Sequence, residues 1–213
     1  NLTVEITDFS HGAKCLAATP DGYVWYTQYQ SDAVFRVSPC GELTTFKTPT
    51  ANSQPYGLAA DAEGNIWFTE KDAGQIGVIN SKGEVKEYPL PPCDSCDLVS
   101  PPAHQRPTSI TLGPDGLMWF LAGYTVGTID KNGKITQRYN PTAIQVEICH
   151  AIVTGPDGNL WVGYERFAAE DQQITIFPLE NTAIINVPHP IASGPDDALW
   201  FLEDADKVTR LSI

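Results

Sequence analysis

Two histidines open two copies of the same short phrase in this sequence. His150 begins "HAIVTGPDGNLW", and His189 begins "HPIASGPDDALW" 39 residues later. An imidazole titrates near neutral pH, so it can act as a general base or a hydrogen-bond donor, and it can bind a metal. Only four histidines occur in the chain, so two of them at one place in a repeat form a candidate catalytic pair.

Three further residues share this place in the repeat. Counting back eight positions from the turn glycine, or from Asp197 where the glycine is replaced, gives Lys14, Tyr56 and Thr108. Most of these positions are polar although the strands behind them are apolar, which is expected at the mouth of a channel that binds a ligand. A solvent-filled channel without a ligand would look the same, so both interpretations stay open.

Carboxylates stand at the end of the tryptophan-bearing strand or in the loop after it in the second, fourth and fifth units. Glu203 and Asp204 follow Trp200 by three and four residues, in the same unit as His189, and are candidate ligands for a cation. Solvated loop acids are the alternative interpretation. The other acids at this place are Glu70, Asp72, Glu165 and Asp206.

The elements that must position these residues come from a repeat. The five tryptophans are Trp25, Trp67, Trp119, Trp161 and Trp200, with spacings of 42, 52, 42 and 39 residues. Each follows a turn, mostly Pro-Asp-Gly, and precedes an alternating Ile/Val segment, a polar turn and a further strand. Four short antiparallel strands repeated about every 42 residues predict the blades of a β-propeller. We expect each tryptophan to pack between neighbouring blades.

The two ends of the chain predict how the ring closes. The last unit stops after three strands, whereas "NLTVEITDFS" at the start resembles an orphan fourth strand. We therefore expect an all-β, five-bladed propeller that forms a single domain over residues 1–213. Its blades cover about 12–50, 54–91, 106–141, 149–180, and 188–213 completed by 1–10. An open stack of sheets is the alternative, and it would leave two exposed edges.

Charge and hydropathy limit the partners. The net charge of −13 argues against nucleic acid and anionic membranes, and no apolar run is long enough to span a bilayer. An acidic chain can bind a cation or a cationic ligand, or simply be soluble. Self-assembly through the rim or the segment "PPCDSCDLVSPP" stays open.

The cysteines and the N-terminus predict an extracellular location. An odd count of five, at positions 15, 40, 93, 96 and 149, leaves at least one thiol unpaired within the chain. The pair at 93 and 96 favours a local disulfide in an exported protein. The first residues contain a glycosylation sequon and no leader of their own, so we expect a trimmed, secreted protein.

The second unit, "GLAADAEGNIWFTEKDAGQIGVINSKGEVKEYPLP", resembles the repeat of the streptogramin B lyase family, and the similarity extends over the whole chain. The resemblance implies a propeller that opens the lactone of a cyclic depsipeptide by elimination. It assigns the proton-abstracting base to His189 and a second histidine role to His150. It also implies a magnesium ion (Mg²⁺) held by two acids, which would polarise the substrate carbonyl.

The match is complete for the histidines and incomplete for the acids. Asp204 stands four residues after the last tryptophan, where the family has one acid, and Val187 stands where it has the other. The family enzymes have seven blades. Three functions therefore remain: a lyase-like enzyme, a non-catalytic extracellular propeller that binds a small molecule or cyclic peptide, and a structural subunit of an assembly.

Overall fold

The computed structural model of the chain is built from β-strands alone in the part that it describes. That part comprises residues 13–28, 30–92, 106–123, 125–139, 148–165, 173–177, 184–185, 191–194, 198–203 and 207–212. It forms five antiparallel sheets, four of them four-stranded and the last three-stranded. It contains no helix that could cross a membrane.

We call the sheets blades 1 to 5 in chain order. Blade 1 consists of β1 (Ala13–Ala18), β2 (Val24–Gln28), β3 (Ala33–Val37) and β4 (Leu43–Lys47). Blade 2 consists of β5 (Pro55–Ala60), β6 (Ile66–Glu70), β7 (Gln75–Ile79) and β8 (Val85–Pro89). Blade 3 consists of β9 (Pro107–Leu112), β10 (Met118–Ala122), β11 (Thr125–Ile129) and β12 (Ile135–Tyr139). Blade 4 consists of β13 (Ile148–Thr154), β14 (Leu160–Glu165), β15 (Gln173–Phe177) and β16 (Ile184–Ile185). Blade 5 consists of β17 (Ile191–Ser193), β18 (Ala198–Glu203) and β19 (Lys207–Ser212).

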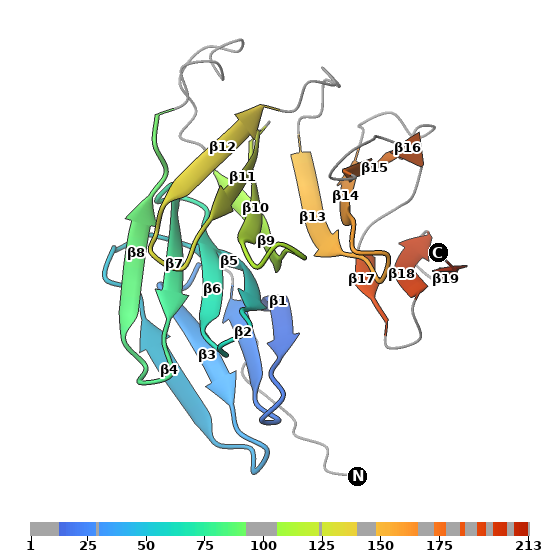
Figure 1. Cartoon of the computed structure of the whole chain (residues 1–213). Coiled ribbons are helices and arrows are strands. Elements are labelled where there is room, and N and C mark those ends of the chain that lie inside the picture. The colour runs from blue at the N-terminus through green and yellow to red at the C-terminus, as the bar shows by residue number, and fades with distance from the viewer. Residues whose placement is uncertain are drawn as a thin grey trace.

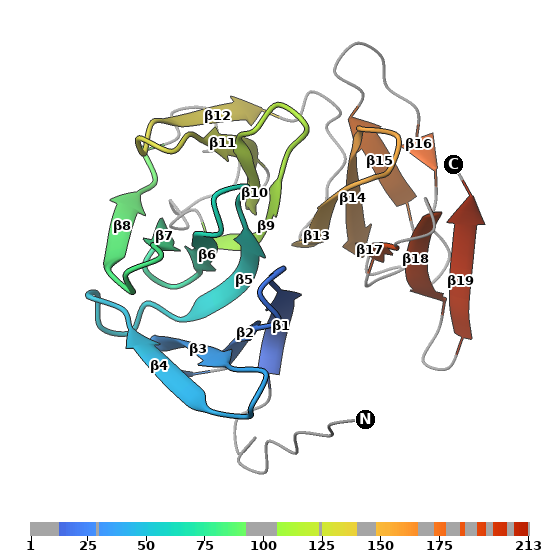
Figure 2. The same cartoon turned by 60° about the horizontal axis from the view of Figure 1, so that its bottom comes forward.

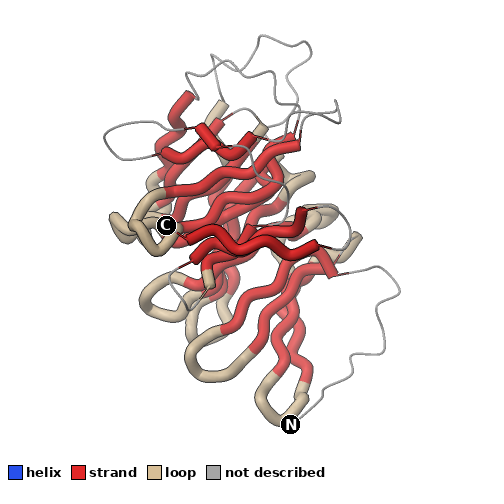
Figure 3. Tube along the Cα trace, turned by 90° about the vertical axis from the view of Figure 1, so that its right-hand side faces the viewer, coloured by secondary structure: helices blue, strands red, loops and turns tan. Residues whose placement is uncertain are grey.

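The first strand of each blade contacts the first strand of the next, from β1 through β5, β9 and β13 to β17. The blades are therefore arranged around an inner row of strands, as Figures 1 and 2 show. Figure 3 shows the strands from the side, joined by turns and loops. The all-β propeller type is confirmed. The described strands form an arc with blade 1 and blade 5 at its ends (Figure 2). The predicted closing strand at residues 1–10 lies outside the described residues.

In blades 2, 3 and 4 the turn before the second strand also holds the tryptophan of that strand. Trp161 donates its indole N–H to Asp157 Oδ1 at 3.1 Å, and the same carboxylate oxygen accepts the backbone N–H of Asn159 at 3.0 Å. In blade 2, Trp67 donates to Asp61 at 2.8 Å. One carboxylate thus fixes both the turn and the orientation of the indole, which explains why the repeat joins an aspartate turn to a tryptophan.

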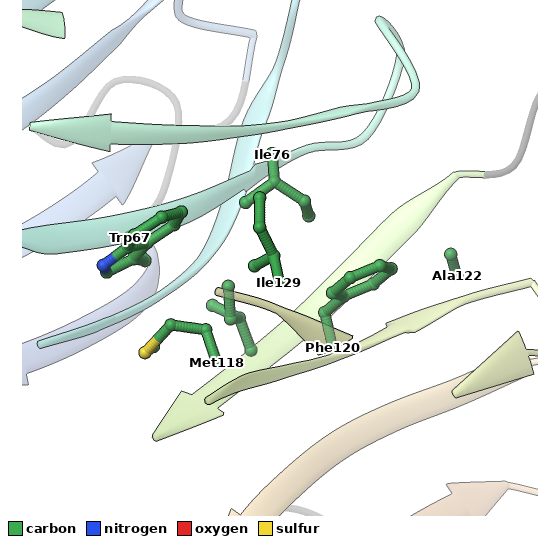
Figure 4. Close-up of a cluster of buried hydrophobic side chains, with 7 residues drawn as sticks. Trp67, Ile76, Met118, Phe120, Ala122 and Ile129 are labelled. Atoms are coloured by element: carbon green, nitrogen blue, oxygen red, sulfur yellow. The ribbon is translucent and has the colours of Figure 1, made fainter. Parts of the chain in front are cut away.

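Trp25, Trp67 and Trp119 each pack against the next blade, as predicted. Trp67 and Ile76 of blade 2 form one buried cluster with Ile110, Met118 and Phe120 of blade 3 (Figure 4). Burying each side chain of this size contributes about 1.5–3 kcal/mol to stability. Interblade contacts therefore hold the inner strands in their places.

A glycine on the third strand lets a phenylalanine on the second strand lie flat across it. A Cβ atom at Gly77 would lie 2.1 Å from Cζ of Phe68, and one at Gly127 would lie 2.4 Å from Cζ of Phe120. The two residues of each pair face each other in register. Any larger residue at these two glycines would displace a fully buried ring.

Candidate functional site

Each of the first four inner strands departs from regular pairing at the same place, near its start. The extra residues are Lys14 in β1, Tyr56 and Gly57 opposite a single residue in β5, Thr108 in β9 and His150 in β13. These β-bulges coincide with the column of candidate residues. Bulges re-aim side chains and are common beside active sites. We call the ends of β1, β5, β9 and β13 that carry the bulges the mouth.

Two ammonium groups approach one aromatic ring at the mouth. Lys71 Nζ lies 4.5 Å from the ring centroid of Tyr56, and Lys14 Nζ lies 5.8 Å from it. Arg106, directly before β9, forms an ion pair with Asp72. The mouth therefore brings Lys14 and Tyr56 together and adds three charged neighbours from blades 2 and 3.

Hydroxyl groups fix the bulges to one another across the blades. Thr27 of blade 1 donates to the carbonyl of Tyr56 in blade 2 at 2.5 Å. Thr69 of blade 2 donates to the carbonyl of Thr108 in blade 3 at 3.3 Å and accepts the N–H of Gly57 at 2.9 Å. The two threonines stand two residues after the tryptophans of their blades. The same side chain in consecutive blades thus positions the bulge residue of the next blade.

The mouth is electrostatically unusual for a chain of net charge −13. Burial lowers the pKa of Lys71, and the positive charges of Arg106 and Lys14 lower it further, against an opposite effect of Asp72. Burial also raises the pKa of Tyr56, which keeps its phenol neutral and able to donate a hydrogen bond. Positive charges therefore lie beside a neutral hydroxyl group.

A second polar cluster lies behind the mouth, between blades 1 and 2. Glu70, the last residue of β6, has 0% of its surface exposed, and its carboxylate lies beside Ser53, Gln75 and Glu87 without a hydrogen bond of regular geometry to a described residue. Burial raises the pKa of Glu70 to about 8, and the charge of Glu87 contributes to this shift. Glu87 accepts hydrogen bonds from the backbone and the hydroxyl of Thr50, at 2.9 and 2.7 Å. Ionised carboxylates cannot donate to each other, so protonation of Glu70 is what makes this burial tolerable.

The sequence matches the virginiamycin B lyase family over residues 2–99 and 94–213. The chain belongs to this family. It is 40% identical over 57 residues to a virginiamycin B lyase from Bordetella pertussis, and 39% identical over 57 residues to one from Bordetella bronchiseptica. Each match covers 24% of this chain and 19% of the relative, so the aligned segment spans about a fifth of the curated relatives.

Solved structures of virginiamycin B lyases share the fold. A streptogramin B lyase structure superimposes with a TM-score of 0.74 at 24% identity, covering 98% of this chain and 71% of the other. A catalytically inactive histidine-to-alanine variant from Staphylococcus aureus, solved with quinupristin, gives a TM-score of 0.74 at 26% identity. That match covers 98% of this chain and 72% of the other. Almost the whole of this chain therefore aligns with about seven-tenths of each of the two solved chains.

The structure places the family's expected catalytic residues only in part. His150 lies in the bulge of β13 next to β9, with only its backbone described, and Glu203 ends β18 in the same way. His189, Asp204 and Val187 lie outside the described residues. No cluster of three or more potential metal ligands occurs in the part of the chain that the structure describes. Val187 offers no donor atom where the family has an acid, so the residues do not supply the full magnesium set.

Sequence reasoning missed Lys71 and misjudged Glu70 in this virginiamycin B lyase relative. Lys71 stands four residues after Trp67, which is the same place in its blade as Asp204 in blade 5. Comparing that position across all units would have found it. The prediction that Glu70 is a mouth acid or a solvated loop acid is wrong, because the cluster between blades 1 and 2 encloses it completely.

Proposed function

We propose that the chain binds a small molecule of the cyclic-peptide class at the mouth. The alignment of four bulges carries this proposal, because it gathers Lys14, Tyr56, Thr108 and His150 from four blades at one end of the inner strands. Membership of the virginiamycin B lyase family supports it, as does the related enzyme solved with quinupristin.

The described side chains suit such a ligand. Tyr56 is half-buried and combines an apolar ring with a polar hydroxyl, so it can pack against a peptide ring and still hydrogen-bond to it. The hydroxyl groups of Thr27 and Thr69 hold the bulges before a ligand arrives. Preorganisation of this kind reduces the entropy lost on binding.

Quinupristin is the probe that tests binding. Calorimetry should detect association, and the ligand should raise the melting temperature of the chain. Tyr56→Leu should weaken binding by about tenfold, as expected for removing one aromatic contact and one hydrogen bond. Tyr23→Leu, at the opposite end of blade 1, is the matched control and should bind normally. Absence of heat and of any shift in melting temperature would overturn the proposal.

Elimination is a second candidate function, favoured by the two histidine phrases that match the family pattern. A neutral His189 would remove the proton α to a substrate carbonyl, and His150 would orient the substrate through a hydrogen bond. The lactone C–O bond at the β carbon would then break, leaving a double bond and a carboxylate. Because Val187 replaces one family acid, we assign no step to magnesium, although Asp204 and Glu203 stay its predicted ligands.

Mass spectrometry distinguishes this reaction from binding alone. Elimination opens the ring of quinupristin without changing its mass, whereas hydrolysis adds one water. Incubation with and without Mg²⁺ tests the predicted cofactor. His189→Ala should abolish opening and His104→Ala should not. An intact quinupristin ring after prolonged incubation would refute elimination and leave ligand binding as the proposed function.

Ring closure, self-assembly and secretion stay predictions. Pairing of residues 1–10 with β19 would be detected by a cysteine pair such as Val4→Cys with Thr209→Cys, which should cross-link on oxidation only if the strands are adjacent. Sedimentation in dilute solution tests the structural-subunit alternative. Self-assembly predicts large particles, and a 23.2 kDa species would exclude it.

A further inference from the structure

Basic side chains gather at the mouth although the chain is strongly acidic. The chain contains only 13 basic residues against 26 acidic ones. Two of them, Lys14 and Lys71, approach the ring of Tyr56 at 5.8 and 4.5 Å. Arg106 stands close enough for its charge to act on Lys71. Positive charges in an acidic chain are thus concentrated where the inner strands of blades 1 to 3 begin.

Asp72 offsets only part of the positive charge that acts on Lys71. Asp72 is paired with Arg106. Lys71 has no carboxylate partner among the residues that the structure describes, and its pKa is lowered by burial and by the neighbouring cations. Like charges held together in a partly buried place destabilise the fold. Such unfavourable charge clusters are common at functional sites.

Backbone hydrogen bonds fix the positions from which the side chains of Lys71 and Tyr56 extend at the mouth. The N–H of Lys71 donates to the carbonyl of Gln54 at 3.0 Å, directly before β5, and Gln54 has a left-handed φ of 53°. The carbonyl of Tyr56 accepts the hydroxyl of Thr27. Lys14 stands at the bulge of β1, next to β5. The arrangement therefore belongs to the backbone of blades 1 and 2.

We propose that Lys14, Lys71 and Tyr56 bind an anionic group, a carboxylate or a phosphate, on the ligand of this mouth. The two ammonium groups supply charge-assisted hydrogen bonds, and the neutral phenol of Tyr56 supplies one more donor. The inference rests on the proposed function in using the same mouth, and it adds an anion-binding subsite to the surface that would contact a cyclic peptide. Binding of that group would raise the pKa of Lys71, because the charge of the anion opposes the repulsion from Arg106 and Lys14.

Calorimetry with matched probes tests the site. Benzoate and inorganic phosphate supply the two anionic groups, and benzamide is the neutral counterpart of benzoate. Both anions should bind the wild-type chain and benzamide should not. Lys71→Met should weaken anion binding by about tenfold or more, and Lys71→Arg should retain it.

Lys86→Met is the control variant, because Lys86 lies 4.7 Å from the ring centroid of Tyr88 on the outer strand β8. It removes an equivalent contact between a cation and a ring away from the mouth, and it should bind benzoate normally. Equal binding of benzoate and benzamide, equal losses in the Lys71 and Lys86 variants, or no anion binding would each overturn the inference. Benzoate binding without quinupristin binding would refute only the peptide class of the ligand, and the reverse result would refute only the anion site.

Discussion

Replacing Glu70 with glutamine is expected to stabilise the folded chain at neutral pH. Glu70 is completely buried beside Ser53, Gln75 and Glu87, and this burial raises its pKa to about 8. Glutamine has nearly the shape of a protonated glutamate and does not ionise. Its side-chain amide N–H can also donate a hydrogen bond to the carboxylate of Glu87. The variant therefore keeps the packing and removes the linkage between folding and proton binding.

The size of the effect follows from the difference between the pKa of Glu70 in the folded chain and its pKa in the unfolded chain. The folded chain keeps the proton on Glu70 up to a pH of about 8, whereas an unfolded glutamate releases it around 4.5. Between these values the folded state binds more protons, so the free energy of unfolding falls by about 1.36 kcal/mol for each unit that the pH rises. The loss begins near pH 4.5, amounts to about 3 kcal/mol at pH 7, and stops growing above pH 8.

Urea unfolding at pH 5, 6, 7 and 8, followed by tryptophan fluorescence, measures this loss. The stability difference between Glu70→Gln and the wild type should be under about 1 kcal/mol at pH 5 and about 3 kcal/mol at pH 7. Glu63→Gln removes an exposed acid from the turn before β6 and should follow the wild-type profile. A constant difference at all four pH values, or a variant less stable than wild type at pH 8, would refute the assignment of a buried neutral acid.

Three further outcomes follow from individual contacts. Gly127→Ala places a Cβ against the buried ring of Phe120 and should lower the free energy of unfolding by about 1–3 kcal/mol in urea titrations. Asp157→Ala removes the acceptor of the Trp161 indole N–H and of two hydrogen bonds from Asn159. It should therefore lower the free energy of unfolding by about 1–3 kcal/mol in the same assay. Burial raises the pKa of Cys15, so peptide mapping after brief iodoacetamide treatment at pH 8 should find it unmodified and exposed Cys40 alkylated.

The repeat made the strands and their packing predictable. In blades 2 and 3, a tryptophan after an aspartate turn is followed by a third strand with a central glycine. The turn carboxylate accepts the indole N–H, and the glycine leaves room for the phenylalanine ring of the second strand. Trp67 and Gly77 show both relations in blade 2. These contacts are local to one blade, so a single unit of sequence contains them.

The mouth was less predictable, because it depends on strand register and on neighbouring blades. Counting from the turn glycine found Lys14 and Tyr56, but no pattern in one strand reveals that both stand at β-bulges. Glu70 follows the same tryptophan pattern as Glu203, yet it is completely buried, and Ser53 of the loop before β5 is one of its neighbours. Burial of that kind is decided by the connection between two blades, whose length and shape vary from unit to unit.

The repeat separates the geometry of the mouth from its charge. Four residues after the tryptophan, the chain has Lys71 in blade 2, Glu165 in blade 4 and Asp204 in blade 5. By the repeat, Glu165 and Asp204 are predicted to lie at the same end of the inner strands as Lys71, and Asp204 lies outside the described residues. The described basic residues of the mouth belong to blades 1 to 3, where Asp72 pairs with Arg106. The candidate residues His150, His189, Glu203 and Asp204 belong to the fourth and fifth units of the repeat. If the proposed anion site and these predicted placements both hold, a ligand that reaches both sides presents an anionic group toward Lys71 and a hydrogen-bonding or cation-associated group toward Asp204.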